Sequence, residues 1–118
     1  MLSGDGVFRI IGKVLDGCAL RQKVLAANLA NVETPGYKRL EVRFDEQLAK
    51  AVESGRPDRL DRVEFEIGPT QGLAARGDGN NVDFGRELGE MSKNNLAFST
   101  FAQLAALRVR RYRDAIGG

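Results

Sequence analysis

Side chains that could carry out catalytic chemistry are scarce in this sequence of 118 residues. Histidine, the usual general base near neutral pH and the commonest metal ligand, is absent. The single cysteine, Cys18, can supply neither an internal disulfide nor a cluster of thiolate ligands. No pair of carboxylates and no nucleophile–base pair stands at a spacing that favours catalysis. The sequence therefore predicts a protein that is not an enzyme, with no catalytic residue, no cofactor and no metal site.

One group of oxygen-bearing side chains, Asp78, Asn80 and Asp83, has the composition of a calcium-binding loop. An EF-hand loop beginning at Asp78 would need an oxygen ligand at its fifth place and a bidentate glutamate at its twelfth. Those places hold Val82 and Gly89. The spacing therefore does not favour calcium binding.

A basic segment near the C-terminal end, residues 108–113, contains four arginines and one tyrosine. Such a segment can bind the phosphate groups of nucleic acids. The chain as a whole, however, has 18 basic and 16 acidic residues and a net charge of only +2. Cations are also favourable at the C-terminal end of a helix, because the helix dipole is negative there. We therefore interpret the arginines as a solvated or subunit-facing helix end, and we expect no nucleic-acid partner and no small-molecule substrate.

Two long helices must position these side chains, and the first lies near the N-terminus. Between Val7 and Val32 apolar residues recur at three- and four-residue steps, which predicts a helix with one apolar face. Pro35 ends this helix, because a proline keeps the residue before it out of the helical region. The residues expected on its packing face are Ile11, Val14, Cys18, Leu25 and Leu29.

A second helix is predicted from Phe84 to the end of the chain, with Asp83 as its N-cap. Its apolar residues follow alternating four- and three-residue steps for about 33 residues, the heptad seam of a coiled coil. Asn95 is the only polar residue in that seam, at a type of position that fixes register. We expect the seam to pack against the first helix or against other subunits, and its residues include Leu88, Met91, Asn95, Phe98, Val109 and Tyr112.

The segment between the two helices is predicted to be small and partly irregular. Residues 34–37, Thr-Pro-Gly-Tyr, have the composition of a type II turn, in which the glycine supplies a positive φ. Four-residue apolar spacing predicts a short helix over residues 44–55. Residues 68–85 are rich in glycine, asparagine and aspartate, which is typical of a loop.

Two stretches in this middle segment alternate between apolar and polar residues, over 40–44 and over 63–67. Alternation of this kind is typical of a strand with one buried face. The two stretches could pair as an antiparallel ribbon, with Arg43 opposite Glu64 or Glu66.

The predicted fold class is mainly α, with long N- and C-terminal helices forming a coiled-coil-like pair and a small β-ribbon and loop region between them. We expect a discontinuous terminal-helix domain of residues 1–36 and 83–118, with residues 37–82 as a connecting region. We expect that region to be too short and too rich in glycine to cover the helices. Apolar residues would then remain on further helix faces, more than a stable monomer exposes. We expect other subunits of a polymer to bury those faces.

The segment from residue 27 to residue 38 contains two asparagines three residues apart at a helix end, Asn28 and Asn31. Their amides are placed to cap backbone groups of the following turn or of a neighbouring chain. The segment resembles the N-terminal signature of flagellar rod, hook and hook-associated proteins, A-N-x-A-N-x-x-T-P-G-Y-K. The residues that match it are Ala27, Asn28, Ala30, Asn31, Thr34, Pro35, Gly36, Tyr37 and Lys38.

The short chain and the uninterrupted T-P-G-Y-K sequence resemble one kind of proximal rod subunit in particular. The other short proximal rod subunit and a soluble helical adaptor protein are the alternatives. The resemblance implies a structural subunit that polymerises into the drive shaft transmitting torque for motility. It implies as partners further copies of the chain, other rod subunits, and ring-junction and export-gate components of the basal body. It also implies a place in the periplasmic rod, reached by flagellar type III export without a cleaved signal peptide.

Overall fold

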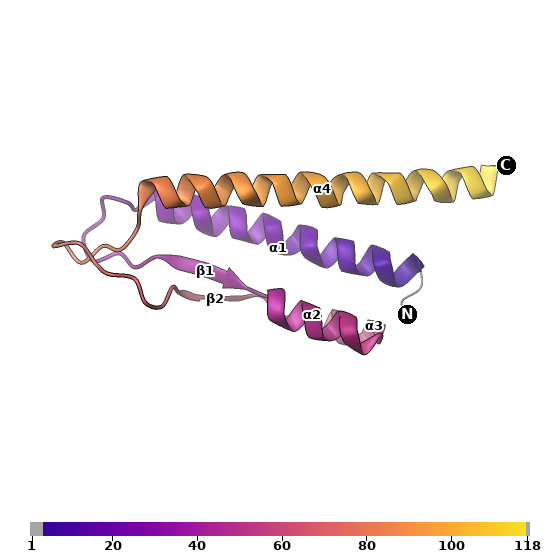
Figure 1. Cartoon of the computed structure of the whole chain (residues 1–118), viewed down its shortest axis with the longest axis horizontal. Coiled ribbons are helices and arrows are strands. Elements are labelled where there is room, and N and C mark those ends of the chain that lie inside the picture. Colours follow the sequence, from indigo (N-terminus) through magenta and orange to yellow (C-terminus); the bar gives the residue numbers. More distant parts are fainter. Residues whose placement is uncertain (1–3, 118) are drawn as a thin grey trace.

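The computed structural model describes residues 4–117. The chain forms, in order, helix α1 (Gly4–Ala30), strand β1 (Leu40–Arg43), helix α2 (Asp45–Ser54), helix α3 (Pro57–Asp61), strand β2 (Glu66–Pro69) and helix α4 (Phe84–Gly117). Two long terminal helices thus flank, in the sequence, a small two-stranded sheet and two short helices, which Figure 1 shows together on one side of α1. The mainly α fold class predicted from the sequence is confirmed.

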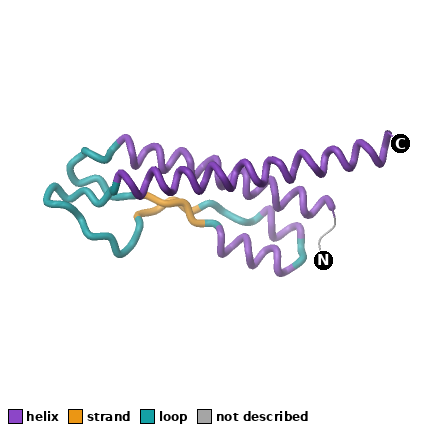
Figure 2. Tube along the Cα trace, turned by 45° about the horizontal axis from the view of Figure 1, so that its top comes forward, coloured by secondary structure: helices purple, strands orange, loops and turns teal. Residues whose placement is uncertain are grey.

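The elements stack in three layers. Helix α1 lies in the middle, with α4 along one side and the β-ribbon with α2 and α3 along the other (Figures 1 and 2). The two long helices run in opposite directions, and the molecule measures 64 × 26 × 14 Å. None of the helices in the described part of the chain is both long and apolar enough to cross a membrane. The result is a thin rod in which α4 packs mainly against α1.

The turn after α1 has the predicted form. The backbone N–H of Tyr37 donates to the carbonyl of Thr34 at 3.2 Å, and Gly36 has a φ of +77°. A positive φ at the second central residue is what a type II turn requires, and a β-branched side chain there would be strained. This turn reverses the direction of the chain, which then runs alongside α1 as β1.

The predicted ribbon is also present and has one of the two expected registers, but β2 begins three residues later than the predicted stretch 63–67 and extends into Gly68 and Pro69, which were expected to be loop. Strands β1 and β2 pair antiparallel, with Arg43 opposite Glu66 and Val42 opposite Ile67. The guanidinium of Arg43, however, donates to the carbonyl of Pro69 at 2.6 Å instead of pairing with Glu66. Helix α2 then ends where the sequence predicts, at Gly55 with a φ of +67°.

A cluster of buried apolar residues lies between α1 and the middle segment. Its buried members come from α1, β1, α2, α3 and the approach to β2, and they are Val24, Val42, Phe44, Ala51, Leu60 and Val63. At Gly17 the Phe44 ring comes so near that a Cβ atom would lie 2.3 Å from it, so only glycine fits. The prediction that the middle segment is too small to cover the helices was therefore wrong for one face of α1.

Helix α4 begins at the predicted position, and Asp83 is its N-cap, accepting a hydrogen bond from the N–H of Arg86 at 2.7 Å. Its packing face differs from the predicted seam. Asn95 is exposed, whereas Asn94 and Glu87 are buried, so the face that meets α1 lies about one residue earlier in the sequence. One residue corresponds to about 100° around a helix, which turns much of the apolar seam away from α1.

Candidate functional site

The signature segment and the loop before α4 form one network of polar contacts, and Asn28 is at its centre. This side chain has no exposed surface. Its Nδ2 donates to the carbonyl of Leu40 at 2.8 Å, and its Oδ1 accepts from the Leu40 N–H at 3.0 Å. The Tyr37 hydroxyl donates to the same Oδ1 at 3.0 Å. Asn28 therefore holds the start of β1 against the end of α1.

The second signature asparagine, Asn31, makes local contacts. Its Nδ2 donates to the carbonyl of Ala27 at 2.8 Å, and its Oδ1 accepts from the Thr34 hydroxyl at 3.0 Å. These contacts continue the last turn of α1 into the type II turn. The two asparagines thus have separate tasks, because one binds the ribbon and the other shapes the turn itself.

A buried ion pair joins the ribbon to the first turns of α4. The Nε of Arg39 lies 2.5 Å from a Glu87 oxygen, and the two side chains are 6% and 0% exposed. Arg39 also donates to the Thr70 hydroxyl at 2.8 Å, and Asn28 donates to Glu87 at 3.3 Å. Removing one member of such a pair would leave a buried charge without a partner, which typically costs about 3–5 kcal/mol. The pair fixes where α4 starts relative to α1.

The loop before α4 is held to the C-terminal end of α1 by Asn80, another fully buried side chain. Its Nδ2 lies within 3.1 Å of the carbonyls of Asn31, Val32 and Thr34. Arg76 adds a donor to the Val32 carbonyl at 2.5 Å. These carbonyls lie in the turn just past α1, which ends at Ala30. Side chains distant in the sequence thus supply hydrogen-bond donors to that turn.

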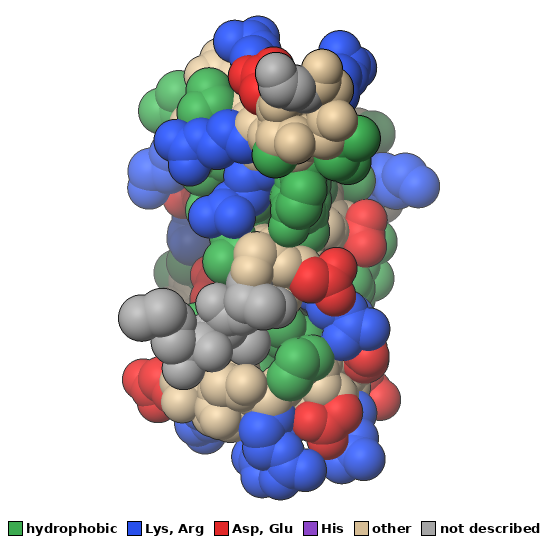
Figure 3. Space-filling model, turned by 90° about the vertical axis from the view of Figure 1, so that its right-hand side faces the viewer, with side chains coloured by type: hydrophobic (Ala, Val, Ile, Leu, Met, Phe, Trp, Pro, Cys, Tyr) green, Lys and Arg blue, Asp and Glu red, His purple; other side chains and the backbone are tan. Residues whose placement is uncertain are grey.

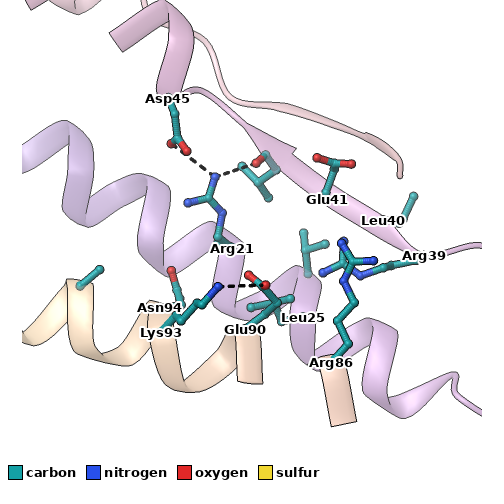
Figure 4. A pocket seen from close by; sticks show the side chains of 13 residues that line it. Arg21, Leu25, Arg39, Leu40, Glu41, Asp45, Arg86, Glu90, Lys93 and Asn94 are labelled. Carbon is teal, nitrogen blue, oxygen red and sulfur yellow. Dashed lines mark hydrogen bonds and ion pairs between the residues drawn. The ribbon is translucent and has the colours of Figure 1, made fainter. Parts of the chain in front are cut away.

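Further along the helices, α1 and α4 make more polar contacts. Asn94 donates to the carbonyl of Cys18 at 2.8 Å and to the side chain of Gln22 at 3.1 Å. Beside these residues an open groove of about 370 Å³ separates α4 from β1 (Figure 4). Charged side chains along it pair with one another, as Arg21 does with Asp45 at 3.4 Å. The helices are thus joined by directed hydrogen bonds, which set register more strictly than apolar contacts do.

Two ionisable groups in this region have shifted pKa values, and both shifts keep the group neutral. Burial raises the pKa of the Tyr37 phenol above 10.0, and the negative charge of Glu87 adds to the effect. Burial is also the main cause that raises the pKa of the Cys18 thiol, with Arg21 opposing it. A protonated, buried thiol is a poor nucleophile. Cys18 therefore acts as a small packing residue.

The apolar seam of α4 is mostly open to solvent. Leu88, Phe98 and Val109 are 43%, 42% and 43% exposed, so the predicted pairing of these residues with α1 within one subunit was wrong. The physical reason is that Glu87 and Asn94 find buried partners on α1 and β1, which turns the seam sideways. The other large apolar residues exposed on α4 are Phe84, Leu96, Leu104, Leu107, Tyr112 and Ile116.

The remaining predicted packing residues lie where α1 meets its neighbours. Ile11, Cys18 and Leu25 are buried. Those that are partly covered are Val14, Leu29 and Met91. Tyr112 is half exposed and stacks on Phe8 at a centroid distance of 5.6 Å, which joins the C-terminal part of α4 to the start of α1. The signature residues Ala27, Ala30, Pro35 and Lys38 are exposed, although the ammonium of Lys38 donates to the carbonyl of Gly79.

Sequence reasoning missed Arg39, Asn80 and Asn94 as members of the network. One signal was available, because Glu87 and Asn94 are seven residues apart and so share a helix face. The apolar residues beside them gave the stronger pattern. Over residues 4–117, no group of three or more histidine, cysteine, aspartate or glutamate side chains is placed to hold a metal ion.

Comparisons with known proteins agree with the resemblance. The family model described as "Flagella basal body rod protein" matches residues 19–38, the second half of α1 and the turn. The flagellar basal body rod protein FlgB of Escherichia coli (strain K12) is 32% identical over 112 residues, covering 80% of each chain. FlgB of Cereibacter sphaeroides is 32% identical over 110 residues, covering 83% of this chain and 84% of that protein.

FlgB of Borrelia hermsii is 30% identical over 112 residues, covering 80% of this chain and 83% of that protein. These matches extend far beyond the signature and include both long helices. Neither the other short rod subunit nor a soluble adaptor is favoured by them. The chain therefore belongs to the FlgB family of flagellar basal body rod proteins.

Proposed function

We propose that this chain, a structural subunit of the proximal rod of the bacterial flagellar basal body, enters the rod by burying the exposed flanks of α4 against neighbouring subunits. The observation that carries the proposal is the division of α4 into two kinds of surface. The side facing α1 is polar and fully partnered around Glu87 and Asn94. The flanks carry large apolar side chains that are 42% or more exposed. Contiguous apolar surface of this kind marks an interaction site.

The same arrangement suits a part that transmits torque. Helix α4 is joined to α1 near both ends of their overlap, by the Asn28–Glu87 contact and by the stacking of Tyr112 on Phe8. A close-packed protein interior has few voids and little slack. Subunits joined through α4 would therefore pass a twisting load along the helix rather than absorb it in a flexible joint.

The family name indicates a location in the flagellar basal body, in assembly with other rod components. We further expect export through the flagellar type III system without cleavage of a signal peptide, and a place in the periplasmic part of the rod. We also expect contacts with ring-junction and export-gate components in addition to further copies of this chain. A structural role needs no catalytic residue, and we expect the protein to have no enzymatic activity.

Complementation in the chain's own bacterium tests the proposal. In a strain that lacks the gene, we expect basal bodies without a rod by electron microscopy, and motility restored by the unaltered chain. Phe98→Asp, on an exposed flank of α4, should prevent rod assembly while the purified protein keeps its helical circular dichroism. Gln71→Asp is the control, because it places the same charge at an exposed position away from α4. Rods and motility that survive Phe98→Asp would overturn the proposal.

A further inference from the structure

We propose that Glu87 and Asn94 are positioning residues for assembly, because they exclude a second packing of α4 on α1 in which α4 covers its own apolar seam. The inference rests on the proposed function, which needs the seam to be open to neighbouring subunits. It goes further by naming a competing arrangement of the same subunit and the side chains that prevent it.

The two long helices carry matching apolar stripes. On α1 the stripe repeats at three- and four-residue steps, and its members Ile11, Cys18 and Leu25 are buried. The seam of α4 has the same period, and none of its positions from 84 to 112 carries a charged side chain. Stripes of this period pack together in coiled coils. Here the match is left largely unused, because Leu88 and Phe98 in the seam are 43% and 42% exposed.

Two polar residues set the rotation of α4 about its own axis. Glu87 and Asn94 are 0% and 6% exposed, and both are held by groups outside α4. Leu88 lies one residue after Glu87, about 100° around the helix, and Met91 lies four residues after it, about 40° around. Turning α4 by about 70° would place Leu88 and Met91 on either side of the direction in which Glu87 now points.

This polar packing sacrifices stability for a defined orientation. A polar residue at a buried position of a helix pair fixes register and lowers stability. Replacing a buried ion pair by apolar residues of similar size is often neutral or stabilising. In the unaltered chain, however, a turn of α4 would separate Glu87 from Arg39, which is itself only 6% exposed. The second packing is therefore closed to the unaltered chain and open to one that lacks these polar groups.

An open hollow beside the seam shows that α1 leaves this surface uncovered. Phe8, Val109, Tyr112 and Ile116 line the hollow, which measures about 840 Å³ and lies where α4 ends. Figure 3 faces this end of the molecule, and hydrophobic side chains lie in the open below the Lys and Arg side chains near the top of the view. The seam is therefore open at the C-terminal end of α4 as well as near its start.

The first test removes both polar anchors without leaving a buried charge, by combining Arg39→Met, Glu87→Leu and Asn94→Leu. The purified subunit also carries Cys18→Ala and Phe98→Cys, and its reaction with a maleimide is followed. We expect labelling about tenfold slower than without the three substitutions, because a covered thiol reacts only when the helix opens. The matched control is Asn95→Leu, the same change at the next and exposed residue, which should leave the rate unchanged.

Stability distinguishes a positioning role from a merely structural one. We expect the urea midpoint of the triple variant, without the cysteine substitutions, to equal or exceed that of the unaltered chain. A structural role predicts a lower midpoint and fast labelling. Either labelling as fast as in the unaltered subunit or loss of the helical circular dichroism would overturn the proposal, because the second packing must be stable and must cover the seam.

Motility provides an independent readout with a conservative variant. The triple variant should fail to restore swimming in the deletion strain. Arg39→Met with Glu87→Gln should restore it, because the glutamine keeps a polar group that Asn28 can bind. Equal swimming of the two variants, or loss in both, would overturn the proposal. If even the unaltered chain fails to restore motility, the proposed function itself is wrong, and the two failures remain distinguishable.

Discussion

The two sides of α1 are built from different chemistry. The side that faces the ribbon, α2 and α3 buries aliphatic and aromatic residues around Leu60 and Phe44. The side that faces α4 buries a carboxylate, a guanidinium and amides, each with a partner. Apolar contacts stabilise without fixing direction, whereas hydrogen-bonded networks fix register. The comparison shows how a small subunit can form a hydrophobic core on one side of α1 and hold a long helix in a defined position on the other side.

The difference also explains why the apolar residues of α4 remain exposed. If α4 met α1 through its apolar seam, the surface for neighbouring subunits would be consumed within the monomer. The polar partners of Glu87 and Asn94 instead hold α4 with few of its large apolar residues buried. Assembly can then use the hydrophobic effect, which grows with the apolar area removed from water.

The largest loss of stability should follow the removal of one member of the buried Arg39–Glu87 pair. Glu87→Ala leaves the Arg39 guanidinium buried without its partner, so we expect the free energy of unfolding to fall by about 3–5 kcal/mol. Urea denaturation followed by circular dichroism measures it. Glu90→Ala, which loses only an exposed pair with Lys93, is the control, with an expected loss below about 1 kcal/mol. Equal losses in the two variants would show that the buried pair does not join the helices.

Truncation of a side chain in the core between α1 and the middle segment should also lower stability. Leu60 has no exposed surface, so we expect Leu60→Ala to lower the free energy of unfolding by about 2–4 kcal/mol. The same urea titration measures this loss. Leu96→Ala is the matched control, because Leu96 is 70% exposed, and the expected change is within about 0.5 kcal/mol. A Leu60→Ala protein as stable as the unaltered one would mean that the core between α1 and the middle segment contributes little.

A smaller loss of stability is expected when one hydrogen bond of the network is removed and its charges stay in place. Tyr37→Phe removes the hydroxyl that donates to Asn28 and leaves the Arg39–Glu87 pair in place. We expect a loss of about 1 kcal/mol in the free energy of unfolding, the usual net value of one hydrogen bond. Tyr112→Phe, which keeps the stacked ring, should change stability less. A larger loss for Tyr112→Phe would place the more important contact at the other end of α1.

The smallest predicted effect is on pH dependence. The pKa of Tyr37 in the folded protein is raised above 10.0 by burial and by Glu87. The neutral phenol therefore stabilises the fold fully below pH 10, and this contribution is lost as pH rises through the raised pKa. In a Tyr112→Phe variant Tyr37 is the sole tyrosine, so its ultraviolet absorbance titration should have a midpoint above 10. A midpoint at or below 10 would mean that Tyr37 is not held in the network.

Local rules were sufficient to predict most of the elements from the sequence, but not helix α3 (Pro57–Asp61), and the second strand was expected three residues before β2 begins. Pro35 and Gly36 determine where α1 ends and how the chain turns, and Asp83 marks the start of α4. These features depend on the backbone preferences of single residues. The end of α1 and the start of α4 were therefore predictable.

The arrangement of the elements depended on contacts that local patterns do not contain. Arg39 and Glu87 are 48 residues apart, and nothing near either residue indicates that the other will neutralise it. The heptad pattern of α4 was real, but it described the exposed flank rather than the face that meets α1. A hydrophobic stripe shows that a surface will be covered and does not show which molecule covers it.

The central claim is that the apolar flank of α4 is open in the free subunit and covered in the rod. The most direct measurement uses Phe98→Cys in a Cys18→Ala background and follows its reaction with a maleimide in the purified monomer and in intact basal bodies. We predict rapid labelling of the monomer and at least tenfold slower labelling in the rod. Equal labelling rates in both states would contradict the account, because the flank would then stay exposed to solvent after assembly.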